Sequence, residues 1–150
     1  MPPVIATAVG IHARGAAELP HCHDKRLVKH SAVGQIVNFL GTLQNEWAGA
    51  QAFSSFDTYM APFIRRDGMS YDAVKQCIQE LIYNLNVPSR WGTQTPFTNL
   101  TFDWTCPEDL REQVPVIAGR EMPFTYGELQ AEMDMINRAY IEVMTEGDAK

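Results

Sequence analysis

The chain has 150 residues, of which 45% are hydrophobic types and 20% are charged, and its formal net charge is -6. This composition is that of a globular domain, so it excludes collagen-like, low-complexity and intrinsically disordered chains. The length suits one domain with its own core. Because the balance is acidic and has no long cluster of lysine and arginine, we expect no DNA binding.

No apolar run approaches the roughly 20 residues that a membrane-spanning helix needs, so we expect no membrane partner. The N-terminus has no basic start before its mildly apolar stretch, which makes it a weak signal peptide. The three cysteines, Cys22, Cys77 and Cys106, are odd in number and widely spaced, unlike a secreted disulfide framework. A cytoplasmic protein with reduced thiols is therefore expected.

Residues 1–30 carry little periodicity and are expected to be loop or poorly ordered. They include a dense group of His21, Cys22, His23 and Asp24, and histidine and cysteine are good zinc ligands. A closed zinc site usually needs paired ligands on a defined turn, and no second cysteine pair follows. We favour a solvated loop over a metal site and assign no metal ligand.

The spacing predicts a helix over residues 31–54, with Ser31 as its cap. Its apolar seam consists of Ile36, Leu40, Leu43, Trp47 and Ala50, at alternating steps of four and three. Gly34, Gly41 and Ala48 recur every seven residues beside it. Since glycine weakens a helix by about 1 kcal/mol relative to alanine, the stripe suggests close approach of another backbone. A core helix and a subunit interface both fit this pattern.

A short helix, broken near Pro62, is expected in residues 55–67, and Gly68 ends it. Ser70 then caps a second long helix. The apolar face of this helix consists of Val74, Cys77, Ile78, Leu81 and Ile82. The place of Cys77 in that stripe predicts a buried structural thiol.

Residues 97–104 alternate and are the one clear strand candidate. One face consists of Phe97, Asn99, Thr101 and Asp103, and the other of Thr98, Leu100, Phe102 and Trp104. Residues 105–124 hold three prolines and are expected to be a long excursion. Thr125 and Glu128 then fit a capping box that opens a third long helix, which runs to about Thr145.

Three long helices with one strand make an incomplete domain, because a strand needs neighbours to satisfy its backbone. The chain also stops directly after a helix end. Both features lead us to expect a piece of something larger.

The most chemical-looking stretch is residues 89–99, which is rich in hydrogen-bonding side chains and leads from a helix into the strand. Such loops line pockets for polar ligands, although a plain polar connection fits equally. The stretch has neither GxGxxG nor GxxxxGK[ST], so it is not a phosphate-binding glycine loop. Residues 44–57 mix amides with aromatics, which favours an interface or a ligand site. With no diagnostic Ser/His/Asp or Cys/His pairing, no catalytic residue is assigned.

Three long segments carry a family resemblance: VGQIVNFLGTLQNEWAGAQAFSSFDTYMAPFIRRDG, LIYNLNVPSRWGTQTPFTNLTFDWT and TYGELQAEMDMINRAYIEVMTEGDAK. They resemble the anaerobic (class III) ribonucleoside-triphosphate reductase, a glycyl radical enzyme. The resemblance runs from about His30 to Lys150, and residues 1–29 match nothing that we can place. The matches are long and ordered, which makes the resemblance specific.

The resemblance implies an α/β fold built as a ten-stranded barrel, of which residues 30–150 would be an early, mostly helical part. It implies a glycyl radical made by a separate radical S-adenosylmethionine activating enzyme. A thiyl radical then removes the ribose 3′ hydrogen, the 2′-hydroxyl leaves as water, and formate is the reductant. Ribonucleoside triphosphates are the implied substrates. Deoxynucleotide or ATP effectors are implied near the interface of a homodimer.

The chain departs from this family by omission. It has no RVxGY-like glycyl radical motif, no four-cysteine zinc site and no recognisable ATP-cone, and its cysteines match no thiyl context. We therefore expect no cofactor within this chain and no activity of the chain alone. The glycyl radical and the zinc are expected in the C-terminal region of the full enzyme.

The resemblance also suggests site residues. Strand Phe97–Trp104 would be a barrel strand that pairs with strands encoded downstream, and the seam over residues 36–50 would join the dimer interface. The expected substrate-binding residues are Arg90, Gln94, Thr98, Asn99 and Thr101. The expected effector-site residues are Gln44, Gln51 and Phe53.

A second hypothesis is a stand-alone helical dimer that binds nucleotides without catalysis. Such a module should melt cooperatively and gain stability with dATP or dTTP. A bare enzyme fragment should be aggregation-prone, because its strand edge and core face are uncovered. We favour the enzyme fragment, since radical transfer needs groups that this chain lacks.

Overall fold

The structure, a computed structural model, describes residues 25–46, 50–86 and 97–147, and side chains of the first helix over residues 32–43. The elements are α2 (Lys25–Glu46), β1 (Gln51–Phe53), α3 (Phe56–Asp67), α4 (Tyr71–Asn86), β2 (Thr98–Leu100), β3 (Val116–Ile117), β4 (Arg120–Glu121), the 3₁₀ turn η1 (Tyr126–Leu129) and α5 (Gln130–Glu146).

Helix α2 begins six residues before the expected Ser31 and ends at Glu46, so the predicted bounds 31–54 were wrong at both ends. In the predicted seam Ile36 and Leu40 are buried, Leu43 is half-buried, and Trp47 lies outside the described residues. Ala50 is exposed and lies beyond the helix. The seam is therefore a core face at its first two positions, and its role in a subunit interface stays a prediction.

The expected close backbone approach does not occur at Gly34. A Cβ built on Gly34 would meet no other heavy atom within 4 Å. Among the described residues, space for a side chain is therefore present at Gly34, and no neighbour there requires a glycine.

Helix α3 runs unbroken through Pro62, contrary to the predicted break. Proline removes one helical hydrogen bond and crowds the preceding turn. However, Ala61, Pro62 and Ile64 are all buried, and α3 packs against α5, so tertiary packing outweighs the local cost. Gly68 ends the helix as predicted, in the left-handed conformation (φ 57°) that glycine adopts freely.

The signals for α4 and α5 are confirmed. The Ser70 hydroxyl accepts a hydrogen bond from the Ala73 amide (3.3 Å) and so caps α4. The predicted face of α4 turns inward, with Val74, Ile78 and Leu81 buried and Cys77 and Ile82 half-buried against the core. Thr125 and Glu128 form the capping box, although the first turn that it opens is the 3₁₀ helix η1.

Strand β2 has a partner upstream in the sequence. It pairs in parallel with the upstream strand β1, in the register Gln51↔Thr98, Ala52↔Asn99 and Phe53↔Leu100. The prediction of downstream pairing therefore missed β1, which had been assigned to the end of a helix. β2 is also shorter than residues 97–104, because its regular pairing ends at Leu100.

The expected excursion over residues 105–124 contains a second sheet that the sequence did not reveal. Strands β3 and β4 pair antiparallel around Ala118 (φ 53°) and Gly119 (φ 74°). Two positive φ values in a two-residue loop are typical of the turn that matches the twist of a hairpin.

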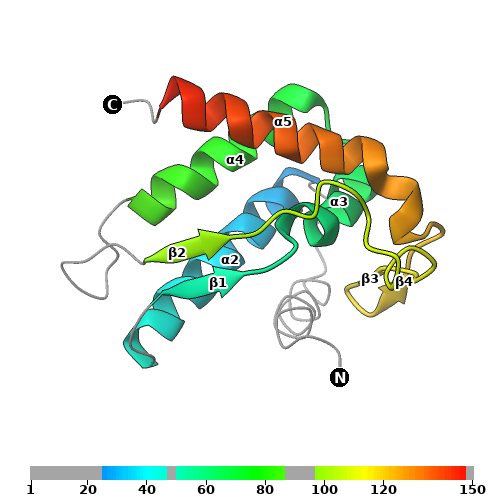
Figure 1. Cartoon of the computed structure of the whole chain (residues 1–150), viewed down its shortest axis with the longest axis horizontal. Coiled ribbons are helices and arrows are strands. Elements are labelled where there is room, and N and C mark those ends of the chain that lie inside the picture. The colour runs from blue at the N-terminus through cyan, green and yellow to red at the C-terminus, as the bar shows by residue number, and fades with distance from the viewer. Residues whose placement is uncertain (1–24, 47–49, 87–96, 148–150) are drawn as a thin grey trace.

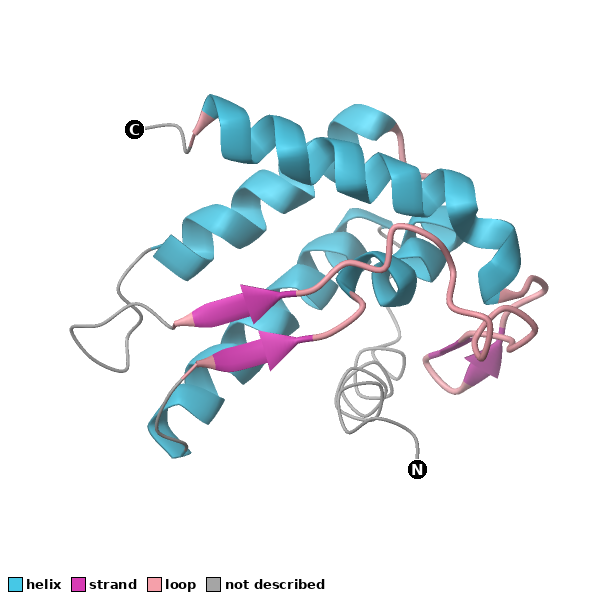
Figure 2. Cartoon of the chain, in the orientation of Figure 1, coloured by secondary structure: helices cyan, strands magenta, loops and turns pink. Residues whose placement is uncertain are grey.

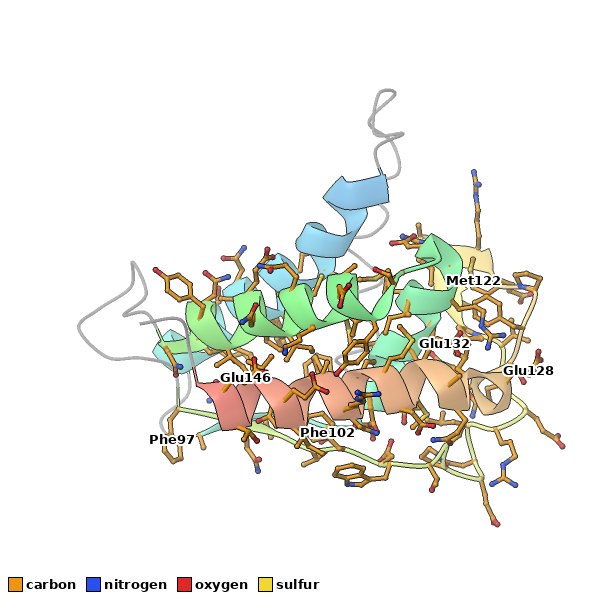
Figure 3. The ribbon with its side chains drawn as sticks, turned by 90° about the horizontal axis from the view of Figure 1, so that it is seen from above. Phe97, Phe102, Met122, Glu128, Glu132 and Glu146 are labelled. Atoms are coloured by element: carbon orange, nitrogen blue, oxygen red, sulfur yellow. The ribbon has the colours of Figure 1, made fainter. Side chains whose placement is uncertain are left out.

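Helix α5 packs along α3 and α4, α2 packs on α4, and the β1–β2 pair lies alongside the helices (Figures 1 and 2). An aromatic group joins the sheet to the helices, since the Phe56 ring meets Phe53 at 5.7 Å and Phe102 at 5.8 Å between centroids. Phe102 in turn lies beside α5, 4.7 Å from the Tyr140 ring (Figure 3). The described residues thus form a mostly helical unit with two small sheets and no closed barrel.

An ion pair fastens α3 to α5. Arg65 donates from Nε and Nη2 to the two carboxylate oxygens of Glu132, at 2.6 and 2.9 Å, and from Nη2 to the Glu128 carbonyl at 2.8 Å. Figure 3 shows both glutamates along the η1–α5 end of the molecule.

None of the described helices combines the length and apolar character needed to cross a membrane.

Candidate functional site

The candidate site lies where the two parallel strands β1 and β2 end. Because the strands run in the same direction, the segments that follow them leave the sheet at the same edge, as Figure 1 shows. In α/β sheets this carboxyl edge is where ligands commonly bind. Here β1 leads into Ser55 and Asp57, and β2 leads into Thr101 and Asp103.

The centre of the site is the carboxylate of Asp57, in the first turn of α3, which is completely buried. Its Oδ1 accepts hydrogen bonds from the backbone amides of Thr58 (3.0 Å) and Asp103 (2.9 Å). Its Oδ2 accepts from the Trp104 amide (2.9 Å) and from Nδ2 of Asn137 (3.0 Å). Four donors and the helix N-terminus compensate a buried charge for which the described residues offer no ion-pair partner.

Asp103 makes the reciprocal connection. Its Oδ1 accepts from the Ser55 hydroxyl (3.2 Å), and its Oδ2 accepts from the Thr58 hydroxyl (2.6 Å). The aspartate after β1 therefore binds the backbone after β2, and the aspartate after β2 binds side chains after β1. We call these residues, together with Asn137, the carboxylate knot: Ser55, Asp57, Thr58, Asp103, Trp104 and Asn137.

Two residues of the knot have strained backbones. Ser55 (φ 54°) and Trp104 (φ 65°) both lie in the left-handed region without being glycine. Such conformations cost on the order of 1 kcal/mol or more each and persist where the surroundings over-determine them. The hydrogen bonds to Asp57 and Asp103 supply that constraint.

The predicted substrate residues divide between two faces of β2. Asn99 is exposed on the outer face, and Thr101 is exposed just beyond the strand. The Thr101 hydroxyl accepts from the Ser55 amide (3.0 Å), so Thr101 also belongs to the strand-end structure. Thr98 is half-buried on the opposite face, where it lies in register with Gln51. Arg90 and Gln94 lie outside the described residues.

The predicted effector residues do not form one group. Gln51 is half-buried on β1 beside Thr98, so a predicted effector residue and a predicted substrate residue are direct neighbours. Phe53 is only 2% exposed and packs against Phe56 in the core, which leaves it no open surface. The side chain of Gln44 lies outside the described residues.

Sequence reasoning missed Asp57, Asp103 and Asn137 as a group. Asn137 lies 80 residues from Asp57, so no local pattern connects them. One signal was available: Asn137 stands on the apolar side of α5, and a buried amide must find a partner. A polar residue among core positions of a predicted helix could therefore have indicated the knot.

A second group, beyond the knot, joins two tyrosines and a thiol. The rings of Tyr59 and Tyr126 meet edge to face at 6.1 Å. Burial, followed by the proximity of Tyr59 and Cys106, raises the pKa of Tyr126 to about 12. Burial also raises the pKa of the Cys106 thiol, whose Sγ lies 3.6 Å from the Pro107 carbonyl oxygen. Both groups are neutral at pH 7, which gives this thiol no nucleophilic activation.

Metal ligands are not grouped in the part of the chain that the structure describes, where no three His, Cys, Asp or Glu residues could hold an ion. The group at residues 21–24 lies outside that part.

The chemistry open to the carboxylate knot is limited by its hydrogen bonds, because each carboxylate oxygen of Asp57 already accepts two. Asp57 is therefore suited to fixing its surroundings and not to transferring protons.

Neither the curated proteins nor the solved structures gave a match to this chain. A family model described as anaerobic ribonucleoside-triphosphate reductase matches residues 24–150. The match covers every described residue, including both parallel strands and the whole carboxylate knot. The chain belongs to the anaerobic ribonucleoside-triphosphate reductase family.

Proposed function

We propose that this chain forms part of a catalytic subunit that reduces ribonucleoside triphosphates to deoxyribonucleoside triphosphates. The observation that carries the proposal is the family match over residues 24–150, which contains the parallel strand pair and the exposed Asn99 on its outer face. Glycyl and thiyl radical chemistry, with formate as the reductant, would be supplied by residues not identified in this chain. The role of the described residues is to bind and orient the nucleotide.

The outer face of β2 is the part of this chain that we assign to the substrate. Asn99 presents an amide that can donate to and accept from ribose hydroxyls or phosphate oxygens. Its neighbour across the sheet is the exposed Ala52, which leaves space beside the amide. Thr101 lies at the strand end with its hydroxyl hydrogen still able to donate.

Regulation and assembly are part of the same proposal. Gln51, next to Thr98, is the described residue that we retain for an effector site, because its side chain is partly accessible. A homodimer through α2 and activation by a radical S-adenosylmethionine enzyme are proposed by analogy with the family. The zinc of the family is proposed to be held outside the described residues, because these contain no suitable ligand group.

The test is Asn99→Ala in the reductase subunit that contains this chain, activated anaerobically and assayed with CTP. Loss of one hydrogen bond to the substrate should lower kcat/KM by about three- to tenfold. Asn84→Ala, which alters an exposed asparagine on α4, is the matched control and should leave both constants unchanged. Wild-type kinetics in a folded Asn99→Ala enzyme would refute the substrate role of this face.

A further inference from the structure

The backbone that follows β2 is held in place by hydrogen bonds and not by a sheet. Regular pairing ends at Leu100, yet the Thr101 amide still donates to the Phe53 carbonyl (3.0 Å). The Thr101 carbonyl then accepts from the Phe56 amide (2.9 Å). Further along, the consecutive amides of Asp103 and Trp104 both donate to the carboxylate of Asp57.

The Asp57 carboxylate joins three separate segments of the chain. It binds the start of α3 through Thr58, the continuation of β2 through Asp103 and Trp104, and α5 through Asn137. It is fully buried, so no solvent competes for these bonds. Removing the carboxylate would take the acceptor from the buried Thr58 amide and the buried Asn137 Nδ2. The left-handed Trp104 would keep only the bond that its carbonyl accepts from Nε2 of Gln130 (2.8 Å).

The segment that Asp57 holds is continuous with the face that we assign to the substrate. Asp103 lies two residues after Thr101 and four after Asn99. A shift of the Asp103 backbone would therefore also move these two residues. The hydroxyl of Thr101 is tied to the same corner through the Ser55 amide. The position of the nucleotide-facing side chains therefore depends on a carboxylate that is buried beneath them.

We propose that Asp57 is a positioning residue of the reductase, which sets the placement of Asn99 and Thr101 by clamping the backbone of Asp103 and Trp104. This inference rests on the proposed function of the β2 outer face. Asn137 is the second half of the clamp, because its Nδ2 completes the coordination of Asp57 from α5. Within the described ranges its Oδ1 is buried and has no hydrogen-bond partner, so the bond from Nδ2 to Asp57 fixes the orientation of the amide.

The experiment measures kcat and KM for CTP in the Asp57→Asn reductase, normalised to folded subunit and to glycyl radical content. The variant keeps the side-chain volume but turns one acceptor oxygen into a donor group. We expect kcat/KM to fall by roughly 10- to 100-fold, with KM raised, because a misplaced binding group weakens substrate orientation. A purely structural role would lower the amount of folded enzyme and leave KM unchanged.

The matched control is Asp72→Asn, which alters an exposed aspartate on α4 and should leave KM at the wild-type value. The exchanged pair Asp57→Asn/Asn137→Asp keeps one carboxylate and one amide at the same hydrogen bond. It should recover part of the lost kcat/KM, as expected for a clamp between these two residues.

If Asp57→Asn does not fold, Asn137→Ala decides the question, because it removes only one of the four donors to Asp57. We expect a smaller rise in KM from this variant, and an unchanged KM would overturn the inference. A folded Asp57→Asn enzyme within twofold of the Asp72→Asn control would overturn it equally. If Asn99→Ala is also without effect, the proposed substrate role of the β2 outer face fails as well. If Asn99→Ala lowers kcat/KM and Asp57→Asn does not, only the positioning role fails.

Discussion

Individual residues in this chain take their roles from partners that are distant in sequence. The alternation of residues 97–104 placed Asn99 on the opposite face of the strand from Thr98 and Leu100, and its exposure beside these two half-buried neighbours agrees with that local inference. Asp57 was not identified, because three of its four donors lie 46 to 80 residues away. Alternation along a strand is a local property, whereas compensation of a buried charge is settled only by the tertiary structure.

Tyr126 provides a test of burial at the scale of one residue. Its pKa of about 12 exceeds the ordinary value of 10, because burial disfavours the phenolate and Tyr59 and Cys106 lie nearby. A raised pKa in the folded state means that this contribution to stability is fully present below pH 10. It is lost as the pH rises through about 12, and with screening by solvent the loss is on the order of 2 kcal/mol.

Spectrophotometric titration of tyrosine absorbance should therefore show a late step that Tyr126→Phe removes. The fall in the free energy of unfolding between pH 10 and about pH 12 should also be smaller in this variant. Tyr83→Phe, which alters a tyrosine that is 48% exposed, is the control and should leave the late step in place. A Tyr126→Phe protein that keeps the late step would show that another tyrosine is responsible for it.

At the scale of elements, the signals that succeeded were short-range. The Thr125–Glu128 capping box, the Ser70 cap and the Gly68 stop each lie within four residues of what they determine. The predictions that were wrong are the helix over the residues of β1 and the break at Pro62. In both places contacts with distant segments decide the structure. β1 forms because β2, 47 residues later, offers a parallel ladder. Helical periodicity over residues 31–54 could not reveal that competition.

Helix α5 offers an internal comparison of the same residue type in two environments. Ile136 is 1% exposed in the core, whereas Ile141, five residues later on the same helix, is 51% exposed. Ile136→Ala removes buried methyl groups and leaves a cavity, so the free energy of unfolding should fall by about 2–5 kcal/mol. Ile141→Ala should change it by less than about 0.5 kcal/mol.

Urea unfolding of both variants, followed by circular dichroism in the same subunit, measures this difference. Equal losses in the two variants would mean that the exposed side of α5 is covered by something outside the described residues. That side of α5 would then be an interface in the subunit, and Ile141 would be exposed only in the isolated chain.

At the scale of the whole molecule, strand edges and apolar side chains of the described residues are uncovered. Neither β1 nor β2 has a second neighbour among the described residues, and a two-stranded sheet is marginal by itself. Several large apolar side chains are also exposed, among them Phe97 (77%) and Trp104 (55%). Unpaired strand edges and apolar surface both promote association. These features fit a part of a larger catalytic subunit better than a self-sufficient nucleotide sensor.

The two possibilities differ in their response to nucleotides. A ligand that binds only the folded state stabilises it by RT ln(1 + [L]/Kd), which is about 2.7 kcal/mol at one hundred times Kd. We expect the chain alone to associate in a concentration-dependent way and to show no rise in Tm with dATP or dTTP. Light scattering after gel filtration and a thermal melt measure the two properties, with inorganic tripolyphosphate as the control for simple phosphate binding. A monodisperse dimer whose Tm rises with dATP but not with tripolyphosphate would contradict this expectation. Effector recognition would then be complete within this chain, with Gln51 as the first residue to substitute.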